Sequence, residues 1–318
     1  MSRGGNTTAR RLCAIATACW WIVAPAPTAA QPATPVRLRI EVPSTADHTP
    51  QPSYLYLPAD FSASSAPMPL AVKLHTWSFD LEQRDTTVES EANARGWLLL
   101  APNFRGRNDN PAACGSKLAQ QDILDAVAWV RAHYPVDGHR IYLLGRSGGG
   151  FLTMMMAARH PATWAAASAW VGISDMRAWY NEHAGDDYGR MMRACYGGSP
   201  GDNENLTAVY GERSPLTYLE SASPVPLDLA AGRSDSVVAF THSLRAFQAL
   251  APGVVSDAEI AALARSGPGL GAPAPADTAS DVLFGRRIFL RRTAGASRVT
   301  IFEGGHEWLA SAAMAWLS

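Results

Sequence analysis

Residues 140–156, RIYLLGRSGGGFLTMMM, lead from a short apolar run through a glycine-rich turn into an apolar helical pattern. A strand that turns on glycines into a helix N-terminus is typical of a phosphate cradle and of a turn that exposes a nucleophile. A phosphate-binding loop carries Lys-Ser or Lys-Thr after its last glycine, but here Phe151 follows Gly150. Residues 145–149 instead fit the pattern G-x-S-x-G. The stretch therefore predicts a sharp turn with Ser147 exposed at its centre.

Short apolar runs alternate with polar, helix-compatible segments on both sides of this turn. Buried strands separated by helices are typical of a parallel sheet with helices on both faces. Two alternating segments ahead of them, 36–42 and 53–58, fit an antiparallel hairpin. We therefore predict an α/β fold with a mostly parallel central sheet. The apolar runs expected as its strands are 69–75, 97–103, 141–144, 164–173 and 226–232.

One domain with insertions accounts for a chain of 318 residues, 47% of them apolar. We assign residues 31–64 to a leader with the first strands and residues 65–318 to a single catalytic domain. The periodicity breaks after Ile173, and the aromatic, glycine-punctuated residues 174–222 are expected to form a cap-like insertion over the carboxyl edge of the sheet. Proline, glycine and alanine dominate residues 266–280, which predicts a mobile loop.

The first 30 residues have the pattern of a targeting segment. Two arginines precede an apolar run, which Pro25 and Pro27 interrupt and which ends in small residues at Ala30. The alternative, a membrane anchor, needs ~20 consecutive apolar residues, more than this run offers. The pattern predicts a secretory signal peptide cleaved near Ala30 and a secreted or periplasmic protein. Cleavage of the signal peptide removes three arginines and no acidic residue, so the formal net charge of the protein changes from -1 to about -4. This balance favours neither nucleic acid nor an anionic membrane surface as a partner.

Two cysteines, Cys114 and Cys195, follow the predicted signal peptide. In an oxidising compartment a pair of cysteines commonly forms a disulfide, and we expect these two to pair. The alternative is two unpaired thiols, because the sequence does not show whether their Cα atoms lie within bonding reach.

A base must accompany Ser147, because a serine hydroxyl is a poor nucleophile until its proton is removed. Among eight histidines, His306 stands out, since it follows an apolar strand through Gly304 and Gly305 and precedes an expected helix. This is a position at a sheet edge. The alternative role for His306 is to cap the helix that begins after it.

The histidine needs an anionic partner that orients its ring. Asp235 lies just past the apolar run 226–232, whereas Asp228 lies inside that run and Asp281 lies beside the predicted mobile loop. We therefore prefer Asp235 over the other two aspartates. The order serine, aspartate, histidine along the chain is that of the α/β-hydrolase fold. The predicted catalytic triad is Ser147, Asp235 and His306.

An oxyanion hole requires two backbone N–H groups near the nucleophile. The first expected donor is Gly148, which follows the serine. The second is expected from the loop after the run 69–75, with Trp77 preferred over Thr76 and with a plain pocket-wall role for Trp77 as the alternative. In the insertion, Trp179 and Tyr180 are expected to line the substrate pocket.

Several segments, among them LHTWSFD, PNFRG, VDGHRIYLLGRSGGG and IFEGGHEWL, together resemble the α/β-hydrolase domain of prolyl oligopeptidase-like serine hydrolases. The likeness is greatest to their stand-alone secreted bacterial members and spans about residues 65–318. It implies the same nucleophile, acid and base as above. It also implies a structural turn at the sheet edge, carried by Asn103, Arg105 and Gly106.

The chain departs from this family in two places. Thr76 stands where the family usually has glycine after histidine, and residues 31–64 are too few for the β-propeller that screens peptides in the oligopeptidases proper. Membership without that propeller does not imply peptidase activity.

We expect a secreted serine hydrolase that acts on a carboxylic ester through an acyl-enzyme. Esters are easier to cleave than amides, because an alkoxide leaves with less help from a general acid. The alternative is a peptidase that cleaves short peptides with the same residues, and a third possibility is a non-catalytic binding module. No cofactor is expected: the segment HAGDD at 183–187 holds potential ligands but lacks the spacing of a metal site. The motif assigns no role to Arg146.

Overall fold

The computed structural model describes residues 35–62, 66–220, 225–265 and 281–318. The predicted signal peptide and the loop at 266–280 lie outside these residues. Among the helices of the described residues, none is both long enough and apolar enough to span a membrane.

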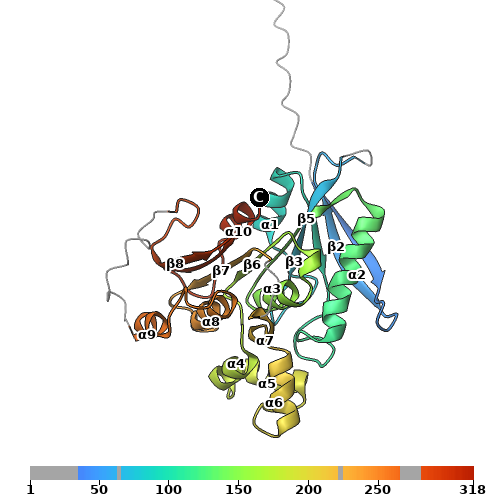
Figure 1. Cartoon of the computed structure of the whole chain (residues 1–318). Helices are drawn as coiled ribbons and strands as arrows, with labels where there is room; N and C mark the ends of the chain where they lie inside the picture. Colours follow the sequence, from blue (N-terminus) through green and yellow to red (C-terminus); the bar gives the residue numbers. More distant parts are fainter. Residues whose placement is uncertain (1–34, 63–65, 221–224, 266–280) are drawn as a thin grey trace, which may run out of the picture. The chain divides into compact units, whose positions relative to one another are not determined.

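Nine strands form one sheet in the described part of the chain, and the predicted α/β fold is confirmed (Figure 1). The central pairs are parallel, whereas the strands at both edges pair antiparallel. The bounds are β1 (Val36–Pro43), β2 (Pro50–Leu57), β3 (Met68–Leu74), β4 (Leu98–Pro102), β5 (Val136–Arg146), β6 (Ala166–Trp170), β7 (Leu227–Gly232), β8 (Ile288–Ala294) and β9 (Ser297–Phe302). Their order in the sheet is β1-β2-β4-β3-β5-β6-β7-β9-β8. The hairpin expected in the leader, β1 and β2, is thus part of the same sheet as the predicted catalytic domain.

Helices cover both faces of this sheet. They are α1 (Thr86–Ala94), α2 (Lys117–His133), α3 (Gly148–Arg159), α4 (Met176–His183), α5 (Asp187–Tyr196), α6 (Glu204–Glu212), α7 (Leu216–Leu219), α8 (Thr241–Leu250), α9 (Asp257–Arg265) and α10 (Ala310–Trp316), with a short 3₁₀ turn η1 (Pro161–Thr163). Alternate residues of the central strands point to opposite faces of the sheet: one core lies beneath α2, α3 and α8, and two smaller cores lie on the face that α1 and α10 cover (Figure 1). This division is the period-two pattern expected of strands buried on both faces.

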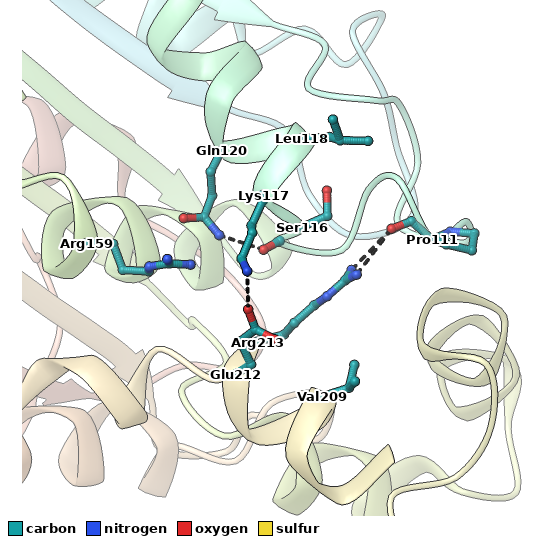
Figure 2. A pocket seen from close by; sticks show the side chains of 10 residues that line it. Pro111, Ser116, Lys117, Leu118, Gln120, Arg159, Val209, Glu212 and Arg213 are labelled. Carbon is teal, nitrogen blue, oxygen red and sulfur yellow. Dashed lines mark hydrogen bonds and ion pairs between the residues drawn. The ribbon is translucent and has the colours of Figure 1, made fainter. Parts of the chain in front are cut away.

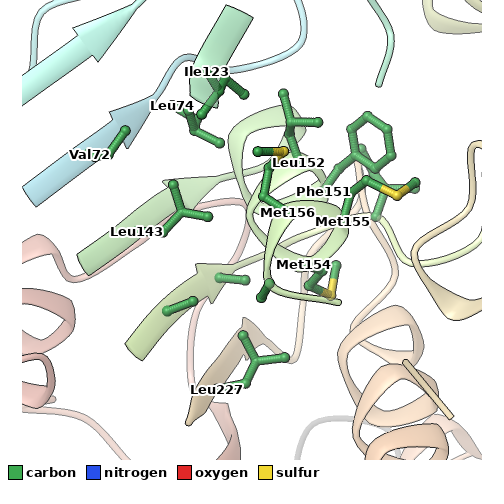
Figure 3. Close-up of a cluster of buried hydrophobic side chains, with 14 of the residues drawn as sticks. Val72, Leu74, Ile123, Leu143, Phe151, Leu152, Met154, Met155, Met156 and Leu227 are labelled. Atoms are coloured by element: carbon green, nitrogen blue, oxygen red, sulfur yellow. The ribbon is translucent and has the colours of Figure 1, made fainter. Parts of the chain in front are cut away.

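The helix that follows the glycine turn is buried almost all round. In α3, Phe151, Met154 and Met155 are fully buried, and the helix packs on β5 and β6 with Ile123 of α2 beside it (Figure 3). A helix that is apolar on every side is stable only inside a protein. Its burial fixes the position of its first turn, and so of the serine that precedes it.

Polar side chains start most of the helices near the site by accepting a backbone N–H of the first turn. The N-cap residues that do so are Asp85, Ser116, Asp175, Asp186 and Asn203. Helix α3 differs, because the side chain of its N-cap residue, Ser147, makes no capping hydrogen bond in the described structure. That hydroxyl is therefore available for another partner.

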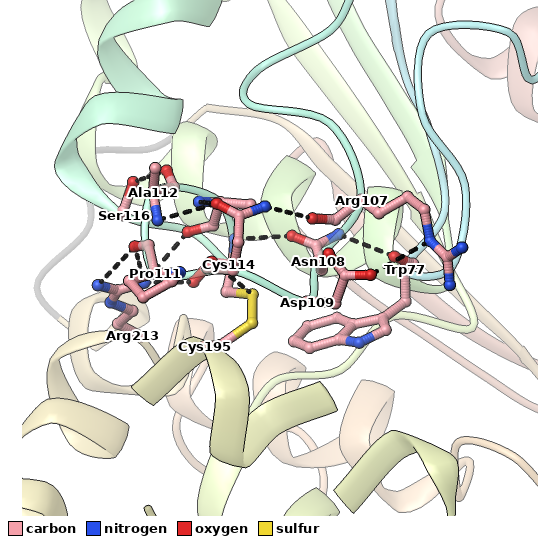
Figure 4. The surroundings of a disulfide bond; sticks show 12 residues. Trp77, Arg107, Asn108, Asp109, Pro111, Ala112, Cys114, Ser116, Cys195 and Arg213 are labelled. Carbon is pink, nitrogen blue, oxygen red and sulfur yellow. Dashed lines mark hydrogen bonds and ion pairs between the residues drawn. A yellow bond between two sulfur atoms is a disulfide. The ribbon is translucent and has the colours of Figure 1, made fainter. Parts of the chain in front are cut away.

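A disulfide ties the insertion to the loop after β4. Cys195 in α5 is bonded to Cys114, with their Cα atoms 6.1 Å apart (Figure 4). The bond joins residues that are 81 apart in sequence. Closing so long a loop restricts the unfolded chain, an effect worth about 4 kcal/mol in the chain-entropy account.

The sheet-edge turn has the structural role that the family resemblance implies. The Arg105 guanidinium donates to Asp122 of α2 at 2.5 Å and to Asp47 of the β1–β2 connection at 2.7 Å. The side chain of Arg105 is 8% exposed and that of Asp122 is 1% exposed, so this ion pair is shielded from solvent, whereas Asp47 lies at the surface. Arg105 also holds the pKa of Asp47 well below its ordinary value by hydrogen bonding. The turn thus fastens the hairpin to α2.

Candidate active site

The backbone at Ser147 turns sharply between β5 and α3. Ser147 has φ 55° and ψ -122°, a positive φ that non-glycine residues rarely adopt. Its N–H donates to the carbonyl of Trp170 at 2.9 Å, and its own carbonyl accepts from Phe151 at 2.8 Å. The strained turn leaves the hydroxyl at the carboxyl edge of the sheet, at the start of α3.

Two glycines of the motif are required by close backbone contact. A Cβ at Gly145 would lie 2.5 Å from the carbonyl of Gly149, and a Cβ at Gly149 would lie 2.4 Å from the oxygen of Leu74. Real side chains do not tolerate such distances. The strand, the turn and the neighbouring strand β3 can meet at this spacing only because these positions are glycine.

The structure brings the three predicted triad residues together. His306 Nε2 lies 2.9 Å from Ser147 Oγ, and His306 Nδ1 lies 2.8 Å from Asp235 Oδ2. Ser147 and His306 are 159 residues apart in sequence. The Asp235 side chain is fully buried, whereas that of His306 is 22% exposed. The hydroxyl that does not cap α3 is therefore bonded to a histidine whose other nitrogen is held by a buried carboxylate.

Asp235 is held in a fixed orientation by its own loop. Its Oδ1 accepts the N–H groups of Val237 and Val238 at 2.8 and 2.9 Å, which leaves Oδ2 for His306. The loop packs backbone to backbone against the histidine loop, since the Ser234 N–H donates to the Gly304 carbonyl at 2.8 Å. This contact fixes the acid and the base relative to each other.

The two weaker acid candidates bind elsewhere. Asp228 is fully buried in β7 and accepts from Arg298 at 2.6 Å and from Ser168 at 2.7 Å. Asp281 is paired with Arg291 at 2.9 Å.

The expected helix after His306 starts later than its apolar pattern suggests. Helix α10 begins at Ala310, and its N-cap position is held by Leu309. His306 therefore lies outside the helix and does not cap it.

Of the three backbone N–H groups considered for the oxyanion hole, those of Gly148 and Trp77 are free to bind an oxyanion within the described structure, whereas that of Thr76 is not. The Gly148 N–H opens α3, where a first-turn N–H has no partner within the helix. The Trp77 backbone N is the nearest atom to a Cβ built on Gly148, at 2.4 Å, and its N–H has no partner among the described residues. Thr76, the other candidate, already donates its N–H to Gln83 at 2.8 Å. The geometry thus favours Gly148 and Trp77 over Thr76.

A buried asparagine holds the loop that carries Trp77. Asn108 donates its backbone N–H and its side-chain Nδ2 to the Trp77 carbonyl at 3.0 and 3.4 Å, and its Oδ1 accepts the N–H of Cys114 at 2.8 Å (Figure 4). The Trp77 indole is buried, with its ring centroid 4.8 Å from that of Trp179. The disulfide loop and the insertion therefore support the second oxyanion donor.

A cavity of about 160 Å³ opens beside the nucleophile. The predicted pocket residues lie elsewhere: Trp179 is fully buried behind Trp77 and donates to the Val237 carbonyl, and the Tyr180 hydroxyl lies 2.8 Å from that of Ser199. The insertion instead contributes Tyr188, from the start of α5. Nothing in the sequence distinguishes this tyrosine from the other aromatic residues of the insertion. The lining residues are Thr76, Trp77, Ser78, Phe79, Arg146, Ser147, Tyr188 and His306.

A larger hollow of about 330 Å³ lies between the N-terminus of α2 and α6 (Figure 2). Lys117 and Glu212 form an ion pair across it at 3.1 Å, and Arg213 donates to the Pro111 carbonyl at 3.3 Å. These charges are thus engaged in docking the insertion onto α2. None of its lining residues belongs to the predicted triad.

The segment 183–187 uses its polar groups structurally. His183 lies 2.6 Å from the Asp186 carboxylate and 2.7 Å from the Val237 carbonyl. In the described ranges, no three or more His, Cys, Asp or Glu residues are grouped so that they could hold a metal ion.

His75, which directly precedes the oxyanion loop, is buried between two carbonyl groups. Its Nδ1 lies 3.0 Å from the Thr76 oxygen, its Nε2 lies 2.9 Å from the Asn103 oxygen, and its ring stacks on Phe104. Burial lowers the pKa of His75 to about 4 and outweighs the two carbonyl oxygens, which favour the charged ring.

This burial predicts a loss of stability in mild acid. Between pH 6.5 and 4 the unfolded chain binds a proton at His75 that the folded chain refuses, so the free energy of unfolding falls as the pH falls. The loss is about 1.4 kcal/mol per pH unit and about 3 kcal/mol in total. Urea unfolding at pH 7, 5.5 and 4.5 measures it, with His75→Gln as the variant that lacks the titration. Parallel pH profiles for the two proteins would contradict this assignment.

Comparison with known proteins relates this site to others. Residues 90–275, more than half of the chain, match the prolyl oligopeptidase family. An uncharacterized peptidase of Bacillus subtilis, YtmA, is 29% identical over 153 residues, which are 47% of this chain and 56% of that protein. Feruloyl esterase B of Neurospora crassa is 28% identical over 158 residues, which are 42% of this chain and 53% of that protein. The chain thus matches about half the length of these curated relatives.

Solved structures of low sequence identity share the fold. Oligopeptidase B from Leishmania major superposes with a TM-score of 0.63 at 13% identity, over 90% of this chain and 35% of that chain. A puromycin hydrolase superposes with a TM-score of 0.62 at 18% identity, over 89% of this chain and 38% of that one. The likeness extends over nearly all of this chain and a minor part of either larger protein.

Proposed function

This chain belongs to the prolyl oligopeptidase family, and from that premise we propose that it is a serine hydrolase that cleaves carboxylic esters through an acyl-enzyme at Ser147. One observation carries the proposal: the unbroken chain of hydrogen bonds from Ser147 through His306 to Asp235. Among its relatives are feruloyl and acetylxylan esterases as well as peptidases.

Acylation begins with proton transfer. As Ser147 Oγ attacks the ester carbonyl carbon, its proton passes to His306 Nε2, and Asp235 stabilises the imidazolium that results. The carbonyl oxygen becomes an oxyanion, which the N–H groups of Gly148 and Trp77 stabilise. The bond to the alcohol oxygen then breaks, and His306 returns its proton to that oxygen.

Deacylation repeats these steps with water as the nucleophile. His306 takes a proton from the water molecule, whose oxygen attacks the acyl carbon. The bond to Ser147 Oγ breaks, and the serine regains its proton from the histidine. The products are a carboxylic acid and an alcohol, and the enzyme returns to its starting state.

The cavity favours an ester with a short acyl group. Its volume of about 160 Å³ lies below the roughly 300 Å³ at which pockets for drug-sized ligands begin. An alkoxide or phenoxide leaves with less protonation than an amine does. The easier departure of the alcohol oxygen supports ester hydrolysis over peptide hydrolysis.

We also propose that the protein is exported. The support is the signal-like pattern of residues 1–30, together with the bond between Cys114 and Cys195, since disulfides persist in oxidising compartments. N-terminal sequencing of protein secreted by a bacterial host would test the proposal, with a new N-terminus near residue 31 as the expected result.

Matched substrates separate the two candidate reactions. We expect 4-nitrophenyl acetate to be hydrolysed with a higher kcat/KM than 4-nitroacetanilide, which has the same acyl group, and than alanyl or prolyl 4-nitroanilides. The comparison uses purified protein, with Ser147→Ala to subtract spontaneous hydrolysis. An amide turned over faster than the ester would replace the esterase by the peptidase.

A further inference from the structure

Arg146 ends β5 immediately before the nucleophile and belongs to the wall of the catalytic cavity. Gly145 faces α3, because its Cβ position abuts Gly149. Side chains alternate along a strand, so Arg146 faces the other side of the sheet, together with the buried Leu144. From there it reaches the cavity that also exposes Ser147 and His306.

Among the described residues, no acidic side chain neutralises this guanidinium. The Arg146 side chain forms neither a hydrogen bond nor an ion pair with them, whereas its backbone pairs with that of Trp170 in β6. A charged neighbour of Arg146 is another cation, Lys73. Burial lowers the pKa of Lys73 to about 8, and repulsion by the positive charge of Arg146 lowers it as well. The carboxylates near Lys73 are occupied, since Asp85 caps α1 and Glu89 pairs with Arg84.

The acid nearest the base along the chain is also occupied. Glu307, which follows His306, forms an ion pair with Arg286 and accepts the Gly305 N–H at 3.2 Å. Arg146 is partly buried and lies near a second cation, so an anion that enters from solvent would stabilise its positive charge electrostatically. The open side of Arg146 is the cavity into which the substrate must come.

The rest of the wall suits an apolar or aromatic stem attached to that anion. Trp77, Phe79 and Tyr188 line the same cavity, and Phe79 is 55% exposed. An aromatic side chain exposed at a cavity mouth can bind flat apolar groups. The cavity thus combines a planar cation with aromatic surface next to Ser147.

We infer that Arg146 binds a carboxylate carried by the substrate, so that the preferred esters are negatively charged. The planar guanidinium presents two parallel N–H donors that match the two oxygens of a carboxylate. This inference rests on the proposed hydrolase function and names its substrate class. The carboxylate belongs either to the acyl part or to the alcohol part, and matched esters distinguish these two positions.

The test compares esters that differ only in charge. For the alcohol side the pair is 4-acetoxybenzoate and its methyl ester, and for the acyl side it is monophenyl adipate and methyl phenyl adipate. We expect wild-type protein to favour the charged member of one pair by about tenfold or more in kcat/KM, the size of effect typical of a hydrogen bond to a charged group. The favoured pair reports where the carboxylate lies.

Variants at Arg146 assign this preference to one side chain. Arg146→Gln should lower kcat/KM of the favoured anion about 10–100 times more than that of its methyl ester, mainly through KM, and Arg146→Lys should restore part of the loss. Arg177→Gln is the matched control, because Arg177 is exposed on α4 and lies outside the cavity wall. It removes one positive charge and should leave both rates unchanged. Equal losses for charged and neutral esters, or no preference in the wild type, would overturn the inference.

A binding measurement keeps this inference separate from the hydrolase proposal. Calorimetric titration of Ser147→Ala with 4-acetoxybenzoate should give a Kd about tenfold or more lower than titration of the double variant that also carries Arg146→Gln. Equal Kd values would overturn anion binding whatever the rates show. If neutral esters are hydrolysed but the two Kd values are equal, anion binding by Arg146 is contradicted and the hydrolase proposal stands. If the protein binds the anion but cleaves no ester, the hydrolase proposal is contradicted and anion binding stands.

Discussion

Ser147→Ala is expected to lower kcat for ester hydrolysis by about 10⁶-fold, to the residual rate that binding and the oxyanion hole alone provide. The physical reason is that the variant lacks the hydroxyl that His306 can deprotonate: Ser147 Oγ is bonded to His306 Nε2 at 2.9 Å, at the start of α3. The variant should also lose covalent labelling by a fluorophosphonate, which intact-mass spectrometry detects as one added group on the wild type.

A second buried serine offers a matched control. Ser174 Oγ lies 3.3 Å from Nδ1 of His242, so it too contacts a histidine, but it is buried and donates to the His242 carbonyl at 2.9 Å. Ser174→Ala should retain both turnover and labelling. Turnover of Ser147→Ala within tenfold of the wild type would remove the acyl-enzyme mechanism at Ser147, whereas a wild-type protein with neither turnover nor labelling would favour the non-catalytic binding module.

Asp235→Asn is expected to lower kcat by about 10⁴-fold while the protein stays folded. The N–H groups of Val237 and Val238 both donate to Oδ1, so the amide oxygen of the variant must take that position. Its NH₂ group then faces His306 Nδ1 and donates to it. The ring is forced into the tautomer that carries its proton on Nε2, where it can no longer accept the proton of Ser147.

Asp228→Asn is the matched control, because it also replaces a buried aspartate by asparagine but at a position outside the predicted triad. Asp228 is buried and bound to Arg298, so its loss should lower the midpoint of urea unfolding while kcat of the folded protein stays within about twofold. Steady-state kinetics and unfolding curves of both variants make the comparison. If Asp228→Asn lost the greater part of kcat and Asp235→Asn did not, the acid would be assigned to the wrong strand.

Local pattern sufficed for the elements around the nucleophile. The apolar run 141–144, the glycines and the apolar helix pattern that follows predict β5, the turn at Ser147 and α3, because strand and helix periodicities and glycine tolerance depend on residues close in sequence. The helix expected directly after His306 begins only at Ala310, because an apolar pattern sets the face of a helix but does not fix its first turn.

Choices between chemically equivalent residues needed contacts across the chain. Thr76 and Trp77 are adjacent in the same loop, and two contacts separate them as oxyanion donors: Gln83 accepts the Thr76 N–H, and the Trp77 backbone N lies against Gly148. Tyr188 lines the cavity while Trp179 and Tyr180 do not, because Trp179 of α4 packs against the buried Trp77 and Tyr188 of α5 packs against Trp179. The amino-acid composition of the insertion does not determine which of its aromatic side chains faces the nucleophile.

The sequence by itself determined the α/β fold, the sharp turn at Ser147 and the order of serine, aspartate and histidine along the chain, since each depends on short apolar runs and on the residues that directly follow them. Only the tertiary structure placed Arg146 in the same cavity as the serine without an acidic partner among the described residues. The physical reason is that charge pairing depends on which side chains meet in the folded chain: Glu89 pairs with Arg84 and Glu307 pairs with Arg286, whereas Arg146 lines the cavity beside Ser147.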